Sequence, residues 1–435
     1  MRISRMKRLG CLGIITLLAA AGGGCSTIAQ LQQSAGNGPH QEVFMDSYGP
    51  TAIRNNLNVP PALPARDPHT FAIGAVLPLK GPQARAGLAM QRGLQLAVAQ
   101  VNASGGINGQ PIQLDIVDDQ GDTARGGEAL SAFDERGANV LLVGDGPLAT
   151  GAAEKLANFP MVIGFMCDYV AALKQTPKNG LRVYLNGDQE GRLIVSYIEE
   201  AGLDRVAIVN QSDLLSTSQT QYLQYLFSGN HSIFSTAESF SAGEKNFALL
   251  GQAMLRVNTG AMVLIGQGQE YGGIFSAFES AGWNGVPFGY TDNGEISALP
   301  TQGRLAAAAA YPLPDFAVNP RSTEAGRAFA DDFHAKFGAD PELPAAYAYD
   351  NIRALAAAAK QAGSTDPDKI RAAFIALGTY TGAAGGYDIK ADGDTEMPLR
   401  LLHADGQPVP PPNKAQALPT STQIKQLQAP TLNQP

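Results

Sequence analysis

The clearest hydrophobic pattern in the chain is a strand, a helix and a second strand between residues 71 and 119. Residues 73–79 form an apolar run of strand length that stops at Gly81-Pro82, and residues 112–117 form another. Between them, residues 87–101 carry apolar side chains interspersed with Gln and Arg, a pattern typical of a helix that packs on a sheet. This order predicts a βαβ unit, in which two parallel strands are joined by a right-handed crossover.

The same alternation of apolar strands and amphipathic helices continues to about residue 362. The predicted elements are helix 124–136, strand 138–143, helix 149–157, strand 161–165, helix 188–200, strand 206–209, helix 218–227, strand 261–265, helix 274–281, strand 286–290, helix 323–337 and helix 345–362. This order indicates an α/β fold whose sheets are mainly parallel and flanked by helices. Ligands of such sheets bind at the carboxyl ends of the strands. The candidate binding loops are 80–87, 144–151, 164–169, 210–217 and 266–273.

The length of the folded span favours two lobes. About 335 residues exceed what a single compact core usually holds. We assign residues 70–185 and 312–385 to the first lobe and residues 186–311 and 386–406 to the second. The chain then crosses between the lobes near Arg182, Tyr311 and Tyr387, and three crossovers are expected to form a hinge.

Residues 1–24 are expected to be a lipoprotein signal peptide. Four basic residues precede an apolar run at 9–21, which is too short to span a bilayer stably. The small residues of Gly22-Gly23-Gly24 before Cys25 favour lipidation of that cysteine, and Ser26 after it favours sorting to the outer membrane. The alternative is an ordinary signal peptide that is cut near Ala21 and leaves Cys25 as a free thiol.

Two flanking segments have compositions that do not support a folded core. Residues 25–69 are rich in Gln, Gly, Asn and Pro with little apolar periodicity, and residues 407–435 combine a run of three prolines with scattered Gln and Thr. We therefore expect a disordered tether before the lobes and a disordered tail after them.

Charge, cysteine and histidine content exclude several functions. The net charge is −8 and no basic cluster occurs outside the signal, so nucleic acid is not an expected partner. The only cysteines are Cys11, Cys25 and Cys167, which leaves no disulfide framework within the chain. The five histidines are scattered without a second metal ligand at helical spacing, so neither a metal nor another cofactor is expected.

Motifs of enzymes are also missing. The loop 146–151 lacks the Lys-Ser/Thr pair of a phosphate loop, and 266–272 has one residue too many for a dinucleotide fingerprint. Neither G-x-S-x-G nor H-E-x-x-H occurs. A hydrolase built on Cys167 would need a histidine beside it, and none can be placed there. We therefore expect that the protein is not an enzyme.

Five short motifs give the chain a family resemblance. They are LPLKGP at 77–82, NASGGINGQPI at 102–112, DDQGD at 118–122, SAGEKNF at 241–247 and HADG at 403–406. Together they resemble the leucine/isoleucine/valine-type substrate-binding proteins of ABC transporters over roughly residues 70–406. The resemblance implies a monomeric, two-lobed protein of the type I periplasmic-binding fold. Such a protein closes on a small-molecule ligand and delivers it to the permease subunits of an ABC importer.

The resemblance also implies which residues contact the ligand. Thr150 matches hydroxyl groups that bind a carboxylate, although it could instead be a plain helix cap. Met166 would supply a backbone acceptor, and Cys167 stands where the family has a threonine, although it could equally be a small buried hydrophobic residue. Asp292 matches the acidic residue that pairs with the ligand's ammonium, whereas Asp before Asn-Gly is also typical of a surface turn.

Other loop positions depart from the family pattern. The tyrosines that clamp the ligand in the family are replaced by Ala86, Leu215 and either Gly268 or Gln269. The first-lobe loops carry the apolar residues Leu148, Phe165 and Met166. These replacements favour a ligand that is larger or more apolar than a branched amino acid.

Two functions remain. The first is a lipid-anchored periplasmic substrate-binding protein that holds an amino-acid-like or apolar carboxylate ligand in the cleft between the lobes. The second is an outer-membrane lipoprotein of the penicillin-binding-protein-activator type, which uses the same fold to bind a cell-wall synthase. The motif NASGGINGQPI favours the first, whereas the lipid anchor, the long tether and the missing tyrosines favour the second.

Overall fold

The computed structural model describes most of the chain outside its two termini. The described residues are 43–46, 49–57, 63, 66–144, 148, 151–164, 179–185, 187–229, 233–266, 268–291, 296 and 299–412. Within these ranges no helix is both long enough and apolar enough to cross a membrane. The predicted signal peptide and Cys25 lie outside the described residues, as does the tail beyond residue 412.

The first lobe is built on a seven-stranded sheet with the order β1-β2-β4-β3-β5-β6-β7. Its strands are β1 (Val43–Asp46), β2 (Gly49–Leu57), β3 (Phe71–Leu77), β4 (Ile112–Asp118), β5 (Val140–Val143), β6 (Val162–Gly164) and β7 (Gly180–Arg182). All neighbours pair in parallel except β1 and β2. The continuous burial of β3 and β5 fits a sheet that helices cover on both faces.

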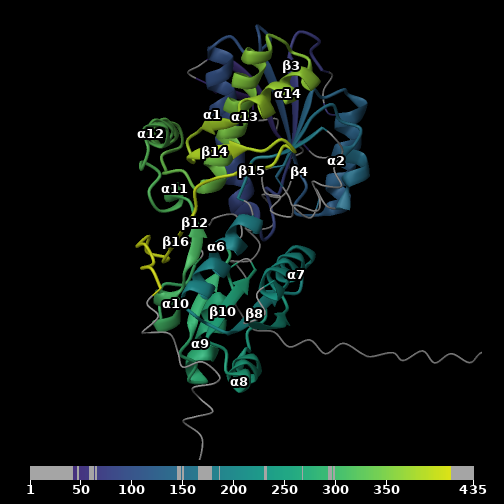
Figure 1. Ribbon diagram of the computed structural model, residues 1–435. Helices are drawn as coiled ribbons and strands as arrows, with labels where there is room; N and C mark the ends of the chain where they lie inside the picture. Colours follow the sequence, from purple (N-terminus) through teal and green to yellow (C-terminus); the bar gives the residue numbers. More distant parts are fainter. Residues whose placement is uncertain are drawn as a thin grey trace, which may run out of the picture. The chain divides into compact units, whose positions relative to one another are not determined.

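Helices cover both faces of this sheet (Figure 1). They are α1 (Ala84–Ala103), α2 (Thr123–Glu135), α4 (Ala153–Leu156), α12 (Glu324–Phe337), α13 (Leu343–Ala362) and α14 (Pro367–Ala376). Residues of α1, α12, α13 and α14 share one core cluster, and residues of α2 and α4 share a second. Helices α1 and α13 approach so closely that a Cβ atom on Gly93 would lie 2.1 Å from the Ala345 carbonyl oxygen. Helix α13, which covers the predicted helix 345–362, therefore packs directly against α1.

The second lobe has a four-stranded parallel sheet with the order β11-β10-β8-β9. Its elements are α6 (Gly187–Glu200), β8 (Arg205–Gln211), α7 (Leu214–Ser228), β9 (Phe234–Phe240), α8 (Ala248–Val257), β10 (Ala261–Ile265), α9 (Tyr271–Ser280), β11 (Val286–Gly289) and α10 (Arg304–Ala308). Residues of α6 and α7 pack on one face of the sheet, and residues of α8, α9 and α10 pack on the other. The predicted α/β fold with mainly parallel, helix-flanked sheets is confirmed.

The third predicted crossover is displaced along the chain. Strands β13 (Thr379–Thr381), β14 (Gly386–Ile389) and β15 (Thr395–Glu396) form one small antiparallel sheet. Tyr387 and Met397 are buried in the same core cluster as α1 and α13. Residues 386–397, which the sequence analysis assigned to the second lobe, therefore pack with the first. A short strand with a buried tyrosine has the same sequence pattern in either lobe, so Tyr387 did not indicate to which lobe its strand belongs.

Two short strands connect the lobes after this hairpin. Strand β16 (Arg400–Leu402) pairs antiparallel with β12 (Tyr311–Leu313), which is followed by the short helix α11 (Asp315–Val318). Leu402 and Tyr311 belong to the core cluster of α8, α9 and α10. The crossover therefore begins after Met397 rather than at Tyr387.

The predicted tether also differs from the structure. Strands β1 and β2 fall within residues 25–69, where β2 pairs with β4 and β1 forms the edge of the sheet. Arg66 then donates hydrogen bonds to the Gly137 carbonyl at 2.6 Å and to Asn139 Oδ1 at 2.9 Å. The composition of this segment did not indicate strands, because β2 depends on pairing with an existing sheet edge rather than on its own apolar pattern.

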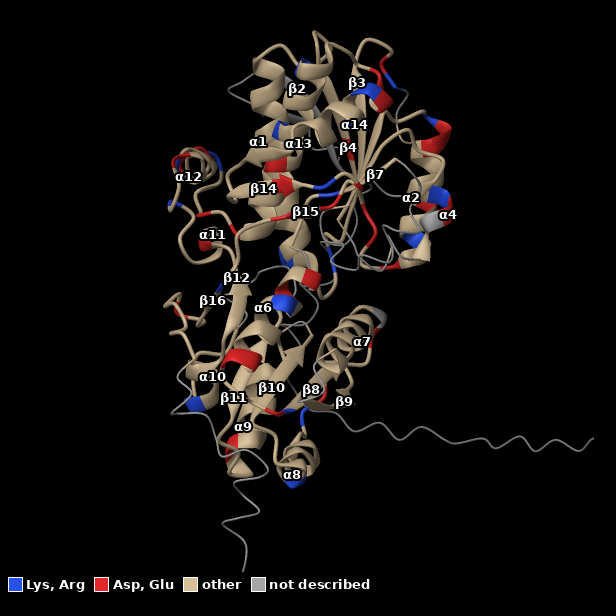
Figure 2. Cartoon of the chain, in the orientation of Figure 1, with Lys and Arg blue, Asp and Glu red and all other residues tan. Residues whose placement is uncertain are grey.

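Charged residues are dispersed over the folded chain (Figure 2). Lys and Arg positions are interspersed with Asp and Glu on the same elements, and several form ion pairs. Examples are Arg85 with Glu342 at 2.8 Å and Arg321 with Asp331 at 3.0 Å. The described surface carries opposite charges side by side, which does not favour a polyanionic partner.

Candidate ligand-binding loops

The loop after β3 is held against the end of β4. Asp118 accepts hydrogen bonds from the backbone N–H groups of Leu79 at 2.9 Å and Gln120 at 3.0 Å. Lys80 lies 3.4 Å from the second oxygen of the same carboxylate, and its own side chain is 67% exposed. The predicted loop 80–87 therefore starts from a fixed position at the carboxyl edge of the sheet, with one exposed ammonium group.

Helix α1 begins very close to this loop. Gly81 has a φ of +82°, which glycine adopts without strain. A Cβ atom on Gly87 would lie 2.1 Å from the Pro78 carbonyl oxygen, so only glycine allows this approach. Ala86 is 1% exposed and its methyl group packs in the core. The ligand contact expected from Ala86 stays a prediction, and the observed methyl group faces the protein interior.

The loop after β5 is also closely packed where it is described. Leu148 is fully buried in the core cluster of α2, and a Cβ atom on Gly126 would lie 2.5 Å from its Cδ1 atom. At the end of β5, a Cβ atom on Gly144 would lie 2.5 Å from Leu77 Cδ2. Leu148 thus fastens this loop to α2. Its predicted contact with a ligand stays untested.

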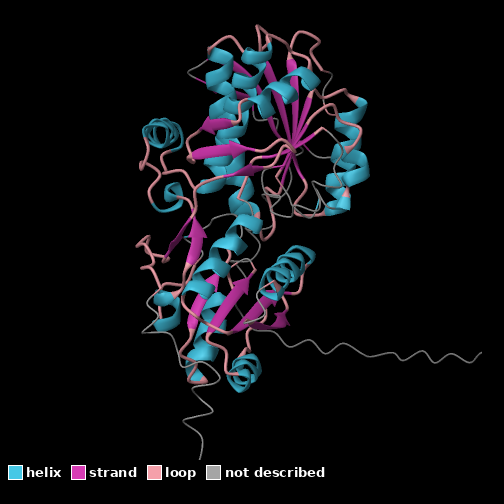
Figure 3. Cartoon of the chain, in the orientation of Figure 1, coloured by secondary structure: helices cyan, strands magenta, loops and turns pink. Residues whose placement is uncertain are grey.

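In the second lobe, helices follow the ends of β8 and β10 (Figure 3). Asp213 caps α7, because its carboxylate accepts hydrogen bonds from Ser216 N and Ser216 Oγ, both at 2.8 Å. Leu215 lies in the first turn of α7 and is half-buried, whereas Gln269 is exposed just before α9. Because β8 and β10 are neighbouring parallel strands, the structure places Leu215 and Gln269 at the same edge of the sheet.

Tyr271 connects two strand ends at this edge. Its hydroxyl group donates to the Gly266 carbonyl at 3.2 Å or to the Tyr290 carbonyl at 3.0 Å, and its side chain is fully buried. Gly266 directly follows β10, and Tyr290 directly follows β11. The sequence analysis did not single out Tyr271. The signal that could have revealed it is an aromatic residue with a hydroxyl group directly after a glycine-rich loop.

The neutral polar side chains of this edge are mostly buried. Gln211 at the end of β8 is 7% exposed, and Asn210 donates a hydrogen bond to its carbonyl at 2.9 Å. Thr291 after β11 is 6% exposed, and its hydroxyl group makes no hydrogen bond with any residue that the structure describes. Asp292, which follows Thr291, lies outside the described residues, as do Thr150, Met166 and Cys167. The roles predicted for these four side chains therefore remain predictions.

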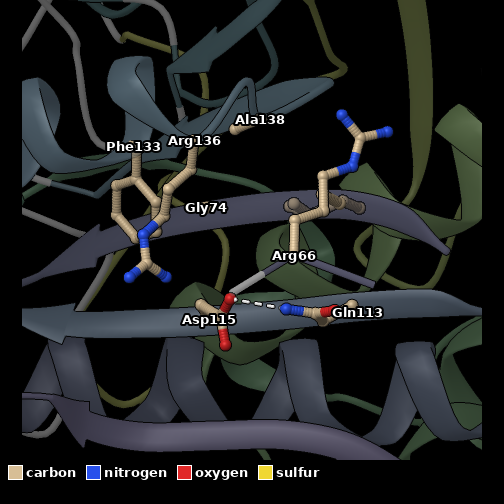
Figure 4. A pocket seen from close by; sticks show the side chains of 9 residues that line it. Arg66, Gly74, Gln113, Asp115, Phe133, Arg136 and Ala138 are labelled. Carbon is tan, nitrogen blue, oxygen red and sulfur yellow. Dashed lines mark hydrogen bonds between the residues drawn. The ribbon is translucent and has the colours of Figure 1, made fainter. Parts of the chain in front are cut away.

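One small cavity lies at the opposite edge of the first-lobe sheet (Figure 4). Its volume is about 20 Å³, and it is lined by Arg66, Ala72, Ile73, Gly74, Gln113, Asp115, Phe133, Arg136 and Ala138. Gln113 donates a hydrogen bond to Asp115 at 3.0 Å along its wall. This volume fits about one water molecule and not an amino acid. The cavity is near the amino ends of β3 and β4, so it does not belong to the candidate loops.

No metal centre is present in the part of the chain that the structure describes. Nowhere in those ranges do three or more His, Cys, Asp or Glu side chains gather in a way that could hold a metal ion. The prediction that no cofactor is needed is not tested by this finding.

Comparisons with known proteins give one consistent result. The sequence profile described as periplasmic binding protein matches residues 70–408. The Leu/Ile/Val-binding protein homolog 1 of Brucella abortus (strain 2308) is 23% identical over 343 residues, which covers 77% of this chain and 91% of that protein.

Two solved structures illustrate the shared fold. The substrate-binding protein of a branched-chain amino acid transporter from Streptococcus pneumoniae, in complex with isoleucine, has a TM-score of 0.64 and 21% identity. The superposition covers 95% of that chain and 77% of this chain. A solute-binding protein of an ABC transporter from R. palustris, in complex with benzoate, has a TM-score of 0.63, 19% identity and coverage of 80% of this chain and 99% of its own.

These relatives bear on the two functions left open by the sequence. The Brucella relative is named as a Leu/Ile/Val-binding protein, and the two solved structures are named as substrate- or solute-binding proteins of transporters. None of them is named as an enzyme, which confirms the expectation that the chain has no catalytic role. They give no support to the alternative of a lipoprotein that activates a cell-wall synthase.

Proposed function

The chain belongs to the periplasmic binding protein family, and we propose that it is the extracytoplasmic substrate-binding protein of an ABC importer. The observation that carries this proposal is the match over residues 70–408, which includes the second-lobe sheet, strands β3 to β7 of the first-lobe sheet and the carboxyl-end loops of both. A receptor of this type binds a small molecule between its two lobes and delivers it to the permease subunits.

The ligand that we propose is an amino-acid-like or apolar carboxylate. The S. pneumoniae relative was solved with isoleucine and the R. palustris relative with benzoate, so a carboxylate is common to both ligands. In this chain, Thr150 would hold the carboxylate, and Asp292 would pair with an ammonium group where the ligand has one. Met166 and Cys167 would contact the head group. Leu215 and Gln269 are at the correct edge of the second-lobe sheet to line the site.

We further propose that Cys25 carries a lipid anchor and that the protein works in the periplasm. Residues 26–42 separate Cys25 from the start of β1 at Val43, and a chain of that length spans at most about 60 Å. The folded domain would then remain near the membrane that holds the lipid. Mass spectrometry of the mature amino terminus tests this proposal, and an unmodified Cys25 would refute it.

Calorimetric titration with leucine, isoleucine and benzoate tests the ligand class. We expect Asp292→Ala to weaken leucine and isoleucine binding more than tenfold, because a buried charge-assisted pair contributes about 2 kcal/mol or more. Benzoate has no ammonium group, so its affinity should change little. Asp368→Ala, which removes an exposed carboxylate from the first turn of α14, is the control.

The outcomes separate two errors. If the wild-type protein binds none of the three probes, the proposed ligand class is wrong. If it binds leucine or isoleucine and Asp292→Ala binds them equally well, only the assignment of Asp292 is wrong. Native mass spectrometry of protein purified from its own host then identifies the molecule that it carries.

A further inference from the structure

The turn and strand at residues 393–397 contact both lobes of the protein. On one side they bind β7 and α13, which belong to the first lobe. On the other side they bind the first turns of α6, which begins the second lobe. Because these residues lie directly before the crossover at 398–399, their contacts bear on how the hinge bends.

Arg182 fixes this segment to the edge of the first-lobe sheet. Its side chain is fully buried, and its Nε and Nη2 atoms each donate to one oxygen of Asp394 at 2.7 Å. The Arg182 backbone N–H donates to the Gly393 carbonyl at 2.9 Å, and Thr395 Oγ1 donates to the Arg182 carbonyl at 3.0 Å. This end of the segment is therefore held by both side chains and backbone.

Met397 continues the same attachment into the first-lobe core. Its side chain is 4% exposed, and its sulfur accepts a hydrogen bond from the Tyr347 hydroxyl at 2.8 Å. Tyr347 belongs to α13 and is fully buried. The position of Met397 is therefore set by the first lobe.

Gln189 of α6 binds the backbone of this fixed residue twice. Its Nε2 donates to the Met397 carbonyl at 2.5 Å, and its Oε1 accepts from the Met397 N–H at 3.2 Å. The side-chain amide of Gln189 thus pairs with both polar backbone atoms of Met397, as the backbone of a neighbouring strand would. One turn later, Arg192 donates to Glu396 at 2.8 Å, although both side chains are well exposed, at 48% and 34%.

Only two residues separate this attachment from the next one. Arg400 begins β16, whose backbone pairs with β12. Pro398 has no N–H group to donate, and neither Pro398 nor Leu399 makes a backbone hydrogen bond among those found outside helices and strands. The third crossover is therefore a two-residue link between two bonded stretches.

We propose that Gln189 is a hinge latch: by pairing with both polar backbone atoms of Met397, it fixes the start of α6 to the first lobe and confines bending of the third crossover to Pro398 and Leu399. The hinge itself follows from the family. The latch is a property of this chain's own residues, and it is independent of which ligand the protein binds.

The test compares Gln189→Leu with Gln100→Leu in the full-length mature protein without ligand. Gln100 also makes side-chain hydrogen bonds, to Asp332 at 2.8 Å and from Tyr349 at 2.6 Å, but all three residues are in the first lobe. Small-angle X-ray scattering measures the distribution of interatomic distances. Hydrogen exchange measures protection of the Met397 amide.

We expect Gln189→Leu to broaden the distance distribution and to raise exchange at the Met397 amide about tenfold, while Gln100→Leu matches the wild type in both. Gln189→Glu is a second variant, which is measured in the same way if Gln189→Leu does not fold. A carboxylate in the first turn of α6 interacts favourably with the helix dipole, so this variant should fold. The substitution removes only the donor to the Met397 carbonyl, so the distance distribution should broaden less than in Gln189→Leu.

Two results would overturn the latch. If Gln189→Glu folds and its scattering profile equals that of the wild type, then the pair does not restrain the lobes. Faster exchange at Met397 with unchanged scattering has the same meaning, because it shows a local contact without any effect on the hinge.

Discussion

The hairpin of β13, β14 and β15 is held by two buried charged residues of opposite sign in very different surroundings. On one side, Asp350 of α13 accepts hydrogen bonds from the N–H groups of Ala383 at 2.6 Å and Ala384 at 2.9 Å. It also accepts one from the Tyr387 hydroxyl at 2.8 Å. On the other side, buried Arg182 is paired with the carboxylate of Asp394.

The two sites differ in the groups that compensate the buried charge. Arg182 faces a full opposite charge, whereas the donors to Asp350 are neutral dipoles. Burial of Asp350 therefore dominates and raises its pKa to about 6, although the three hydrogen bonds and more distant Arg353 act in the opposite direction. Gly382 allows this arrangement, because a Cβ atom there would lie 2.4 Å from the Asp350 carboxyl group. The stability contributed by Asp350 should thus depend on pH between about 4 and 6, whereas that contributed by Arg182 should depend on the presence of Asp394.

The largest effect is expected from breaking the ion pair. Asp394→Ala leaves the fully buried guanidinium group of Arg182 without its carboxylate, which should lower the free energy of unfolding by about 3–5 kcal/mol. Urea denaturation measures the loss. Asp388→Ala removes an exposed carboxylate from the same hairpin and serves as the control.

The double variant Arg182→Met with Asp394→Leu sharpens this comparison. It removes both charges together, so it should be more stable than Asp394→Ala alone. A single Asp394→Ala variant that loses less than about 1 kcal/mol would show that water reaches Arg182 and that the pair is not an anchor.

The second-largest effect is the change in the free energy of unfolding with pH that the titration of Asp350 causes. Its folded-state pKa of about 6 is above its ordinary value of 3.8, so the protonated form is favoured by folding. Its contribution to stability is fully present below pH 3.8 and is lost as the pH rises through 6. The free energy of unfolding should therefore fall by up to about 3 kcal/mol over this window because of this one group.

Asp350→Asn isolates this contribution. The asparagine does not titrate, so the difference in unfolding free energy between wild type and variant should change between pH 4 and pH 7 by about 2 kcal/mol. Urea denaturation at several pH values measures this difference. A difference that is constant over the range would mean that Asp350 stays ionised and that its three donors outweigh its burial.

The elements with a strong local pattern were predicted correctly from the sequence. Strand β3, helix α1 and strand β4 follow from two apolar runs and the intervening helical pattern, and β10 matches residue for residue. Strand β9 was missed because it is an edge strand in which only Phe240 is buried and which shows no apolar alternation. Helices α8 and α14 were missed as well, although α14 begins with a capping Asp366 and a proline.

The Arg182–Asp394 pair, the hydrogen bonds of Asp350 and the latch formed by Gln189 could not be predicted from local sequence patterns. Arg182 and Asp394 are 212 positions apart, and Gln189 and Met397 are 208 apart, so no local spacing connects them. Asp350 stands in an alanine-rich helix, where an acidic residue suggests an exposed face. The candidate loops were predictable because the carboxyl edge of a parallel sheet follows from the order of elements, whereas side-chain pairing depends on the folded topology.

The smallest effect is expected from the exposed counterpart of the buried ion pair. Arg192 and Glu396 join the same hairpin to α6 at 2.8 Å, but their side chains are 48% and 34% exposed, whereas Arg182 is fully buried. Arg192→Gln should lower the free energy of unfolding by about 0.5 kcal/mol at low salt, and by less as salt screens the pair. Urea denaturation in 50 and about 500 mM sodium chloride measures both values. A loss as large as that of Asp394→Ala, or one that salt does not reduce, would mean that burial is not what separates the two pairs.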